Sequence, residues 1–463
     1  MDAEASSRRR AQWTANWTTG DGFLLVPAGL PSPIAGSDQP YDFRVHAEHR
    51  YLGGGSEPGQ VLAFDPADGW TYFVHVASEI EAIWEGPPKD LQQHAAESGI
   101  DDVRPTTDLP GWLAARNGQR TAVLGNTDLL AEPGGYGLDE TPALHRDDTW
   151  RDELRHELDT QRRTKDATEL AWLEKAARAS AAGHVAAMKV ARPGMTEREV
   201  RAEIEAAFVR AGGEEPAYAT IVATGAHGSV LHFSPTDTRL EAGETVLVDA
   251  GTECAGYAGD ITRVFPVGAR FSPEQRELYE IVLRANEAAI AATRPGTEYV
   301  DLHFTAAAII AEGLVDFGLL RGAPADLVDR DAHALFFPHG IGHLIGLCTH
   351  DVGGMADGRE PRTRFGLDRL RTDLPVQPGY VFTIEPGIYF IEALLTDGAR
   401  REKFADAVNW DRVDRLLDPA VLGCGGIRVE DMVAVTEDGC RVMTSGVPKQ
   451  VAEIEELRAE TLR

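Results

Sequence analysis

The 463-residue sequence has few cysteines, few basic residues and no long hydrophobic run. Its four cysteines, Cys254, Cys348, Cys424 and Cys440, lack the paired spacing of a zinc-thiolate site or a disulfide framework, which favours a reducing compartment. No apolar run approaches the roughly 20 residues of a membrane helix, and no apolar stretch follows the basic residues 8–10 as in a signal peptide. We therefore expect a cytoplasmic protein.

Basic residues are outnumbered, because 45 Lys and Arg stand against 74 Asp and Glu, a formal net charge of −29. Such a field repels nucleic-acid phosphates and anionic membrane surfaces, so neither is an expected partner. Hydrophobic residues make up 43% of the chain and charged residues 26%, which argues against disorder and against a coiled-coil rod. The length predicts two or three domains.

The two ends of the chain differ in pattern. Short β-prone runs such as residues 70–76, separated by Gly, Pro and Asp turns, fill the first part. Residues 152–165 are highly charged, and a helical spacing of apolar residues begins near Leu170. We predict an N-terminal mixed α/β domain over residues 1–160 and a second domain over residues 161–463.

The second domain contains an internal repeat. A helical segment ends at Arg-Pro-Gly, residues 192–194, and Thr196 begins the next helix with a capping box. About 100 residues further on, a helix capped by Ser272 ends at a second Arg-Pro-Gly, residues 294–296, and Thr297 begins another. Because β-rich sequence follows each helix pair, we predict two similar α-α-β halves, with a chance recurrence as the alternative.

Two carboxylates stand at the ends of β-prone segments in the first half. An apolar strand over residues 244–249 ends in Asp249, and residues 259–265, which include Asp260, alternate as an antiparallel partner after a Gly-rich turn. The two aspartates can therefore face each other across one hairpin. Taken alone, each is more often a turn or capping residue.

The second half adds three histidines and two glutamates. His339, His343 and His350 lie in a Gly-rich stretch too irregular for an amphipathic helix. Glu385 ends an apolar run and Glu430 lies within another, where an unpaired carboxylate is costly to keep charged. Two Asp, two Glu and one His form an oxygen-rich set that suits a pair of divalent cations between the halves.

The motifs around Asp249, Asp260, His343, Glu385 and Glu430 resemble those of the pita-bread metallopeptidases, which include methionine aminopeptidase, aminopeptidase P and prolidase. The N-terminal motifs Asp-Phe-Arg, from residue 42, and Glu-Ala-Ile-Trp, from residue 81, are similar to the N-terminal domain of prolidase and aminopeptidase P. The resemblance implies an α/β (α+β) fold class, with a creatinase/prolidase-like domain followed by a pita-bread domain.

The same resemblance implies roles for the five residues. Asp249 would bind one metal ion and Asp260 would bridge the two. His343 and Glu385 would bind the other ion, and Glu430 would bridge again. The ions would lower the pKa of a shared water and polarise the scissile carbonyl, with Glu385 as the proton carrier. Mn²⁺ is favoured, and Co²⁺, Zn²⁺ and Fe²⁺ stay open.

Further residues match the family pattern around those ligands. His232 resembles the histidine that faces the substrate, and His350 resembles the one that steadies the tetrahedral intermediate. Tyr218 and Arg428 resemble residues that hold the bridging ligands in place. For His339, a structural role and a substrate contact are equally open.

The stretch over residues 370–379 resembles the prolidase segment whose arginine binds the substrate carboxylate. Arg371 offers the planar fork that pairs with the free carboxylate of a C-terminal proline. We therefore predict a prolidase, an Xaa-Pro dipeptidase, acting as a homodimer on peptide substrates. Trp84 resembles a prolidase tryptophan at the dimer interface and would reach the substrate pocket, unless it is a core tryptophan.

Three alternatives stand beside that prediction. Aminopeptidase P would release the N-terminal residue of longer Xaa-Pro peptides. A creatinase-type amidinohydrolase works without metal, and the five filled ligand positions argue against it. A catalytically inactive binding homologue would have lost ligands or catalytic histidines, and this chain keeps His232, His343 and His350.

Overall fold

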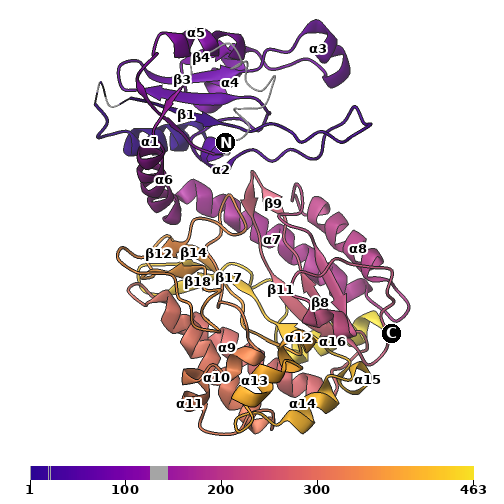
Figure 1. Ribbon diagram of the computed structural model, residues 1–463. Coiled ribbons are helices and arrows are strands. Elements are labelled where there is room, and N and C mark those ends of the chain that lie inside the picture. Colours follow the sequence, from indigo (N-terminus) through magenta and orange to yellow (C-terminus); the bar gives the residue numbers. More distant parts are fainter. Residues whose placement is uncertain (1, 19, 21, 126–143) are drawn as a thin grey trace. The chain divides into compact units, whose positions relative to one another are not determined.

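A computed structural model describes residues 2–18, 20, 22–125 and 144–463 (Figure 1). The chain divides into two units, Met1–Arg162 and Arg163–Arg463. Among the described residues, no helix combines the length and the apolar character that crossing a bilayer requires.

The first unit is built on one mixed sheet with the strand order β4-β3-β2-β1-β5-β6. Its strands are β1 (Phe23–Pro27), β2 (Val61–Asp65), β3 (Gly69–Val74), β4 (Asp102–Pro105), β5 (Arg120–Val123) and β6 (His145–Arg146). Its helices are α1 (Ala3–Trp13), α2 (Ala47–Tyr51), α3 (Glu79–Glu85), α4 (Leu91–Ser98), α5 (Leu109–Ala114) and α6 (Asp148–Arg163). The charged stretch near residue 155 is therefore helical, because Leu154 and Leu158 give α6 a buried stripe.

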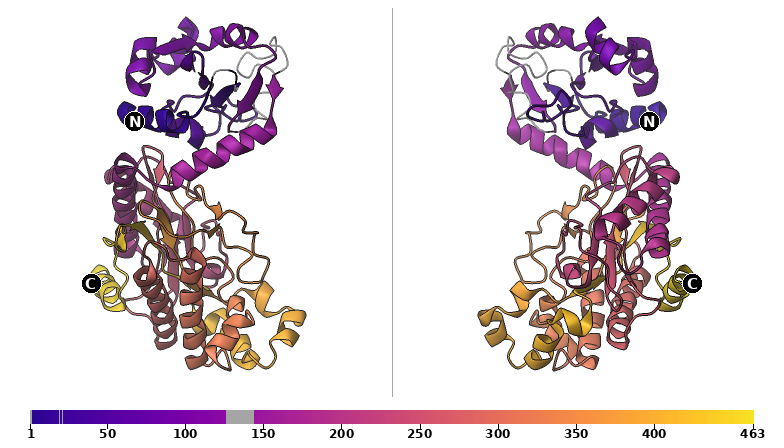
Figure 2. Two further views of the ribbon diagram at one scale, coloured as in Figure 1. Left: turned by 90° about the vertical axis from the view of Figure 1, so that its left-hand side faces the viewer. Right: turned by 90° about the vertical axis from the view of Figure 1, so that its right-hand side faces the viewer.

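The second unit has two helix pairs, each followed by strands. The helices are α7 (Ala167–Val190), α8 (Glu197–Arg210), α9 (Pro273–Ala292), α10 (Tyr299–Asp316), α11 (Pro324–Asp329), α12 (Glu392–Leu395), α13 (Gly398–Lys403), α14 (Trp410–Leu416), α15 (Pro419–Leu422) and α16 (Val451–Thr461). The strands are β7 (Ile221–Thr224), β8 (Thr245–Asp249), β9 (Glu253–Cys254), β10 (Tyr257–Ala258), β11 (Thr262–Pro266), β12 (Gly354–Met355), β13 (Thr372–Asp373), β14 (Val381–Ile384), β15 (Gly387–Tyr389), β16 (Gly426–Arg428), β17 (Asp431–Val435) and β18 (Cys440–Val442). Helix α8 contacts β7, and α9 contacts β14 to β16 and β18, so each helix pair covers its own strands (Figures 1 and 2).

The two halves share their turn geometry as well as their element order. Gly194 follows α7 with φ 91°, and its N–H donates to the carbonyl of Leu240 at 2.9 Å. Gly296 follows α9 with φ 86°, and its N–H donates to the carbonyl of Val376 at 2.8 Å. A positive φ favours glycine at both positions. The predicted fold of an N-terminal α/β domain and two duplicated halves is confirmed.

The helices of the second unit begin where predicted, with one difference. Thr196 caps α8 in a capping box, and Ser272 caps α9 with Pro273 at the first helical position. The fourth helix begins one residue later than predicted, because Glu298 is the N-cap of α10 and the Thr297 hydroxyl donates back to the carbonyl of Ala292 at 3.2 Å.

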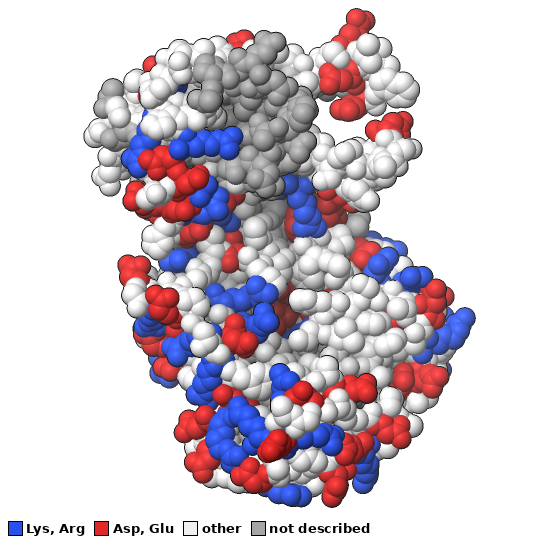
Figure 3. Space-filling view, viewed as in Figure 1, with Lys and Arg blue, Asp and Glu red and all other residues white. Residues whose placement is uncertain are grey.

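The surface carries the charge imbalance in a mixed pattern. On the face shown in Figure 3, Lys and Arg side chains lie among Asp and Glu side chains rather than forming one continuous basic area.

Candidate metal centre

The first half of the second unit brings two carboxylates together. Strand β8 ends at Asp249, which pairs with Thr262 of β11, and Asp260 lies two residues before Thr262. The Tyr218 hydroxyl oxygen lies 2.6 Å from Asp249 Oδ1 and 2.5 Å from Asp260 Oδ1. One hydroxyl proton serves only one of these contacts, so the other needs a proton on an aspartate when no cation is bound.

Glu430 of the second half joins this pair through Thr262. The two residues form an isolated antiparallel bridge, with the N–H of Glu430 donating to the Thr262 carbonyl at 3.1 Å. The Thr262 hydroxyl also donates to Glu430 Oε2 at 2.7 Å. These hydrogen bonds therefore join the two duplicated halves at a candidate metal ligand.

His343 and Glu385 complete the group. His343 Nε2 lies 3.4 Å from Asp260 Oδ2 and 3.8 Å from Glu385 Oε1. His343 Nδ1 lies 3.1 Å from the Leu344 carbonyl, a contact that requires the proton on Nδ1. The lone pair of Nε2 therefore faces the carboxylates, as a metal-binding histidine needs.

The five residues form one group, here called the metal cluster: Asp249, Asp260, His343, Glu385 and Glu430. Asp260, His343 and Glu430 each place a ligand atom within 4.8 Å of the other two, and they are the only such group of three among the residues that the structure describes. Asp249 joins them through the Tyr218 hydroxyl, and Glu385 joins them through His343. An oxygen-rich set with one imidazole fits divalent cations.

The charges of the metal cluster are not balanced by the protein. Burial, followed by repulsion from neighbouring carboxylates, raises the pKa values of Asp260, Glu385 and Glu430 well above their usual range. Burial lowers the pKa of His343, so that ring stays neutral and able to bind a cation. The cluster therefore takes up either protons or cations.

Arg428 fixes the position of Asp249. Its guanidinium is buried and pairs with Asp249 Oδ2, while its Nε donates to the Thr262 hydroxyl at 3.0 Å. Its Nη1 donates to the Tyr389 hydroxyl at 2.8 Å. Tyr389 in turn lies 2.9 Å from Nε2 of His339, whose Nδ1 is 2.8 Å from the Gly340 carbonyl. Both ring nitrogens of His339 thus have protein partners, which favours a structural role over a substrate contact.

Three further candidate residues of the second unit lie near the metal cluster: His350, Arg371 and His232. The His350 ring stands edge-on to His343 with the ring centroids 4.3 Å apart. Arg371 and His232 are both exposed, and both lie within electrostatic reach of His350. Trp84 lies on α3 of the first unit, which holds none of the other candidates. At 82% exposure it is not a core tryptophan.

Three contributors were not identified from the sequence. Thr262 follows Asp260 by two residues in the alternating segment 259–265, a signal that was available in the sequence. Tyr389 lies between Arg428 and His339, and only the fold shows this. Asp351, next to His350, accepts from Lys165 Nζ at 2.9 Å in a pair whose side chains are 2% and 1% exposed.

Comparison with known proteins places this geometry in a family. The model of "Metallopeptidase family M24" matches residues 171–437, and that of "Aminopeptidase P, N-terminal domain" matches residues 6–124. The chain therefore belongs to metallopeptidase family M24, and within it to the aminopeptidase P group.

Relatives agree along nearly the whole length. A protein of Emericella nidulans named probable Xaa-Pro aminopeptidase is 32% identical over 471 residues, covering 99% of this chain and 97% of the relative. The structure of Pseudomonas aeruginosa aminopeptidase PepP has a TM-score of 0.82 at 32% identity, covering 100% of this chain and 99% of that one. Escherichia coli aminopeptidase P with the inhibitor Pro-Leu has a TM-score of 0.81 at 30% identity, with the same coverage.

The predicted prolidase activity is wrong. The relatives are named Xaa-Pro aminopeptidases, and the similar structures are of aminopeptidase P. The prediction depended on Arg371, which is exposed. An exposed guanidinium can pair with a terminal carboxylate or a peptide carbonyl alike, so this residue does not distinguish a dipeptide from a longer peptide. The metallopeptidase class is confirmed.

Proposed function

We propose that this chain is an Xaa-Pro aminopeptidase, which hydrolyses the bond between the N-terminal residue and a following proline in peptides longer than two residues. One observation carries the proposal. Five candidate ligands from both halves of the second unit gather in one cluster, in a chain whose relatives over 97% of their length are named for this activity. The Pro-Leu bound to the Escherichia coli relative is what cleavage of an Xaa-Pro-Leu peptide would release.

Two divalent cations would be held by the metal cluster, with Asp249 on one ion, Asp260 and Glu430 between both, and His343 with Glu385 on the other. When bound, such a pair supplies a lowered water pKa and polarises the scissile carbonyl. Carboxylate-rich ligands suit Mn²⁺, which we propose as the working ion. Arg428 and Tyr218 keep Asp249 and Asp260 in place.

Glu385 is our candidate for moving the proton. Its side chain is 19% exposed, against 6% for Asp260 and 5% for His343, so it can contact both the cluster and a bound peptide. The leaving group is the proline nitrogen, which needs a proton as the bond breaks. A carboxylate beside the reacting atoms can take a proton from the water and pass it to that nitrogen.

Substrate contacts are assigned to the residues around the cluster. His232 faces the peptide, and His350 donates to the developing oxyanion beside His343. Arg371, at the exposed rim, binds a carbonyl or carboxylate of the peptide beyond the proline.

The test compares Ala-Pro-Ala, Ala-Pro and Ala-Ala-Ala as substrates of the Mn²⁺-loaded protein, with release of free alanine as the readout. We expect Ala-Pro-Ala to be cleaved with the highest kcat/KM and Ala-Ala-Ala to be a poor substrate. The matched control is the Glu385→Gln protein under the same conditions. Faster hydrolysis of Ala-Ala-Ala, or none of Ala-Pro-Ala by protein with two bound Mn²⁺, would contradict the proposal.

A further inference from the structure

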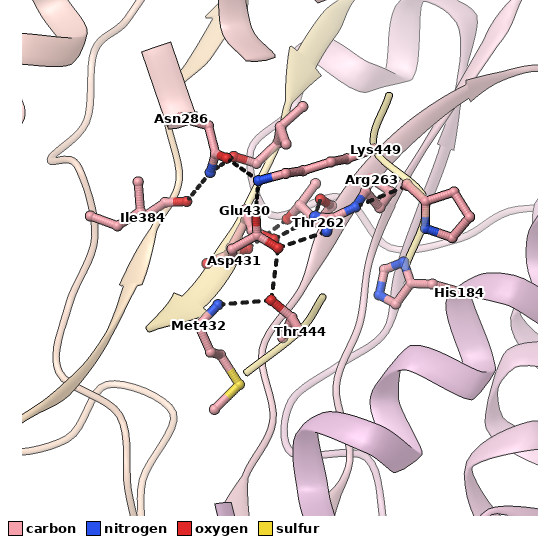
Figure 4. Close-up of polar contacts among 12 residues, drawn as sticks. His184, Thr262, Arg263, Asn286, Ile384, Glu430, Asp431, Met432, Thr444 and Lys449 are labelled. Atoms are coloured by element: carbon pink, nitrogen blue, oxygen red, sulfur yellow. Dashed lines mark hydrogen bonds and ion pairs between the residues drawn. The ribbon is translucent and has the colours of Figure 1, made fainter. Parts of the chain in front are cut away.

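A second polar cluster surrounds Asp431, the residue that follows Glu430 in the sequence (Figure 4). It is here called the clamp network, and its members are Arg263, Asn286, Asp431, Thr444 and Lys449. The side chains of Arg263 and Asp431 are completely buried, as are Asn286 and Thr444, and the Lys449 side chain is 20% exposed.

Asp431 is the centre of the clamp network. Its Oδ1 accepts from Arg263 Nη2 and from the Thr444 hydroxyl, both at 2.7 Å. Its Oδ2 accepts from Lys449 Nζ at 2.8 Å. This buried carboxylate is thus paired with two cations and needs no metal ion.

Arg263 connects that carboxylate to the backbone of both halves. Its Nη1 donates to the Thr262 carbonyl at 3.0 Å and to the Glu430 carbonyl at 2.6 Å. These carbonyls belong to the two residues of the bridge that joins the halves. The guanidinium therefore holds the backbone of a proposed bridging ligand directly.

Asn286, on α9, connects the network to the other glutamate. Its Oδ1 accepts from Lys449 Nζ at 2.9 Å. Its Nδ2 donates to the carbonyls of Ile384 at 3.0 Å and Val429 at 3.2 Å. Each of these residues immediately precedes a proposed metal ligand, Glu385 in one case and Glu430 in the other.

We propose that the clamp network is a positioning device that sets the spacing of the Glu385 and Glu430 carboxylates, with Asn286 and Lys449 as positioning residues for cation binding. The proposal rests on the proposed metal site, and it extends it to residues that contact no cation. The side chains of the network reach the backbone at or beside these two ligands, where a small displacement moves the ligand oxygens. A residue that only filled the core would have no such set of contacts.

The test uses two isosteric substitutions on the same helix. Asn286→Asp keeps the oxygen that accepts from Lys449 and removes both donations to the Ile384 and Val429 carbonyls. The matched control is Gln275→Glu, because Gln275 is also buried on α9 and its Nε2 donates to two carbonyls, of Gly243 and Leu422, both at 2.8 Å. Neither of those carbonyls adjoins a proposed ligand.

Mn²⁺ affinity and stoichiometry are measured by titration calorimetry, together with Tm without metal and with kcat and KM. We expect Asn286→Asp to weaken Mn²⁺ binding by roughly 10- to 100-fold and to lower kcat more than it raises KM. Gln275→Glu should leave Mn²⁺ affinity within about twofold of wild type even if its Tm falls by the same amount. Equal Mn²⁺ affinities for the two variants would overturn the proposal.

Variants of Lys449 provide a second test, which does not depend on whether the Asn286→Asp variant folds. Lys449→Met should weaken Mn²⁺ binding, and Lys449→Arg should restore most of it because a cation returns to Asp431. Wild-type Mn²⁺ affinity in Lys449→Met would count against the clamp network. Because the Mn²⁺ affinities are measured without peptide, they stand even if the wild-type protein binds two Mn²⁺ and cleaves no Xaa-Pro substrate.

Discussion

The metal cluster and the clamp network are both buried and both charged, but they are balanced in opposite ways. The metal cluster has four carboxylates. Among the described residues, Arg428 is the only buried cationic side chain that contacts one of them directly. In the clamp network, one carboxylate is paired with Arg263 and Lys449. Burial alone would raise the pKa of Asp431, yet the two cations hold it at about 2.

The difference separates structure from function. A buried carboxylate with its own protein cations stays charged at any physiological pH and contributes to the fold. Buried carboxylates without them have raised pKa values and depend on something from outside, which is typical of a functional site. The adjacent residues Glu430, just before β17, and Asp431, the first residue of β17, show both cases. In extended backbone, successive side chains point to opposite faces.

Asp260→Ala is expected to have the largest effect. Loss of a proposed bridging ligand should lower the amount of bound Mn²⁺ and reduce kcat/KM by more than about 100-fold. That is more than the largest loss typical of residues that only orient metal ligands. Elemental analysis and peptide hydrolysis check both effects, and Glu430→Ala should behave alike. Full activity and full metal content in Asp260→Ala would show that the ligand assignment is incorrect.

Asp431→Ala tests the balanced cluster. Removing this carboxylate leaves buried Arg263 without its charge partner, which should cost about 3–5 kcal/mol in the free energy of unfolding. Urea unfolding of metal-free protein measures the loss. Asp406→Ala is the control, since its ion pair with Arg330 is exposed to solvent and contributes little to stability. Equal losses in the two variants would show that the buried ion pair of Asp431 contributes no more to stability than an exposed one.

Glu385→Gln should affect turnover more than metal retention. The amide can still contact a cation through its oxygen but cannot carry a proton, so kcat should fall by roughly 100-fold or more. Stopped assays at saturating Ala-Pro-Ala, with metal content measured on the same samples, separate the two effects. A kcat close to wild type would exclude Glu385 as the proton carrier.

Without metal, the contribution of the metal cluster to the pH dependence of stability should have an unusual sign. Carboxyls whose pKa is raised in the folded state bind more protons there than in the unfolded chain, so they stabilise the fold at low pH. That contribution is lost as the pH rises from about 4 towards the raised values. We expect saturating Mn²⁺ to reverse this trend and Mn²⁺ affinity to rise with pH, because binding releases protons. Scanning calorimetry with and without Mn²⁺ tests it, with Glu430→Gln as the variant that should flatten the metal-free slope.

The smallest effect is expected on α3. There, apolar side chains are exposed and have no packing partner among the described residues. Ile80, Ile83 and Trp84 are 69%, 75% and 82% exposed and share one helix face by their spacing. We expect Trp84→Ala to shift a homodimer towards monomer with little change in Tm. Light scattering measures the shift, and a wild-type protein that is monomeric and fully active would contradict a role in a second subunit.

The sequence allowed the grouping of the metal cluster to be predicted because its signals are local. Asp249 and Glu385 each end an apolar strand, and His343 lies in a Gly-rich loop, so each position departs from the ordinary pattern of a core. Tyr389 and Lys449 carry no such signal. Their partners lie 18 to 163 residues away and depend on how the halves pair. The choice between dipeptide and longer peptide could not be predicted, because one exposed arginine suits both.

The bridge between Thr262 and Glu430 also bears on how the chain reaches its native state. It joins positions 168 residues apart, whereas each helix pair forms from neighbouring segments. Contacts of such long range close slowly and late, after local structure has appeared. During synthesis, Asp249 and Asp260 leave the ribosome well before Glu430 and Lys449, so an emerging chain has no complete set of ligands. Completion of the metal cluster is thus delayed until Glu430 has been made and has paired with Thr262.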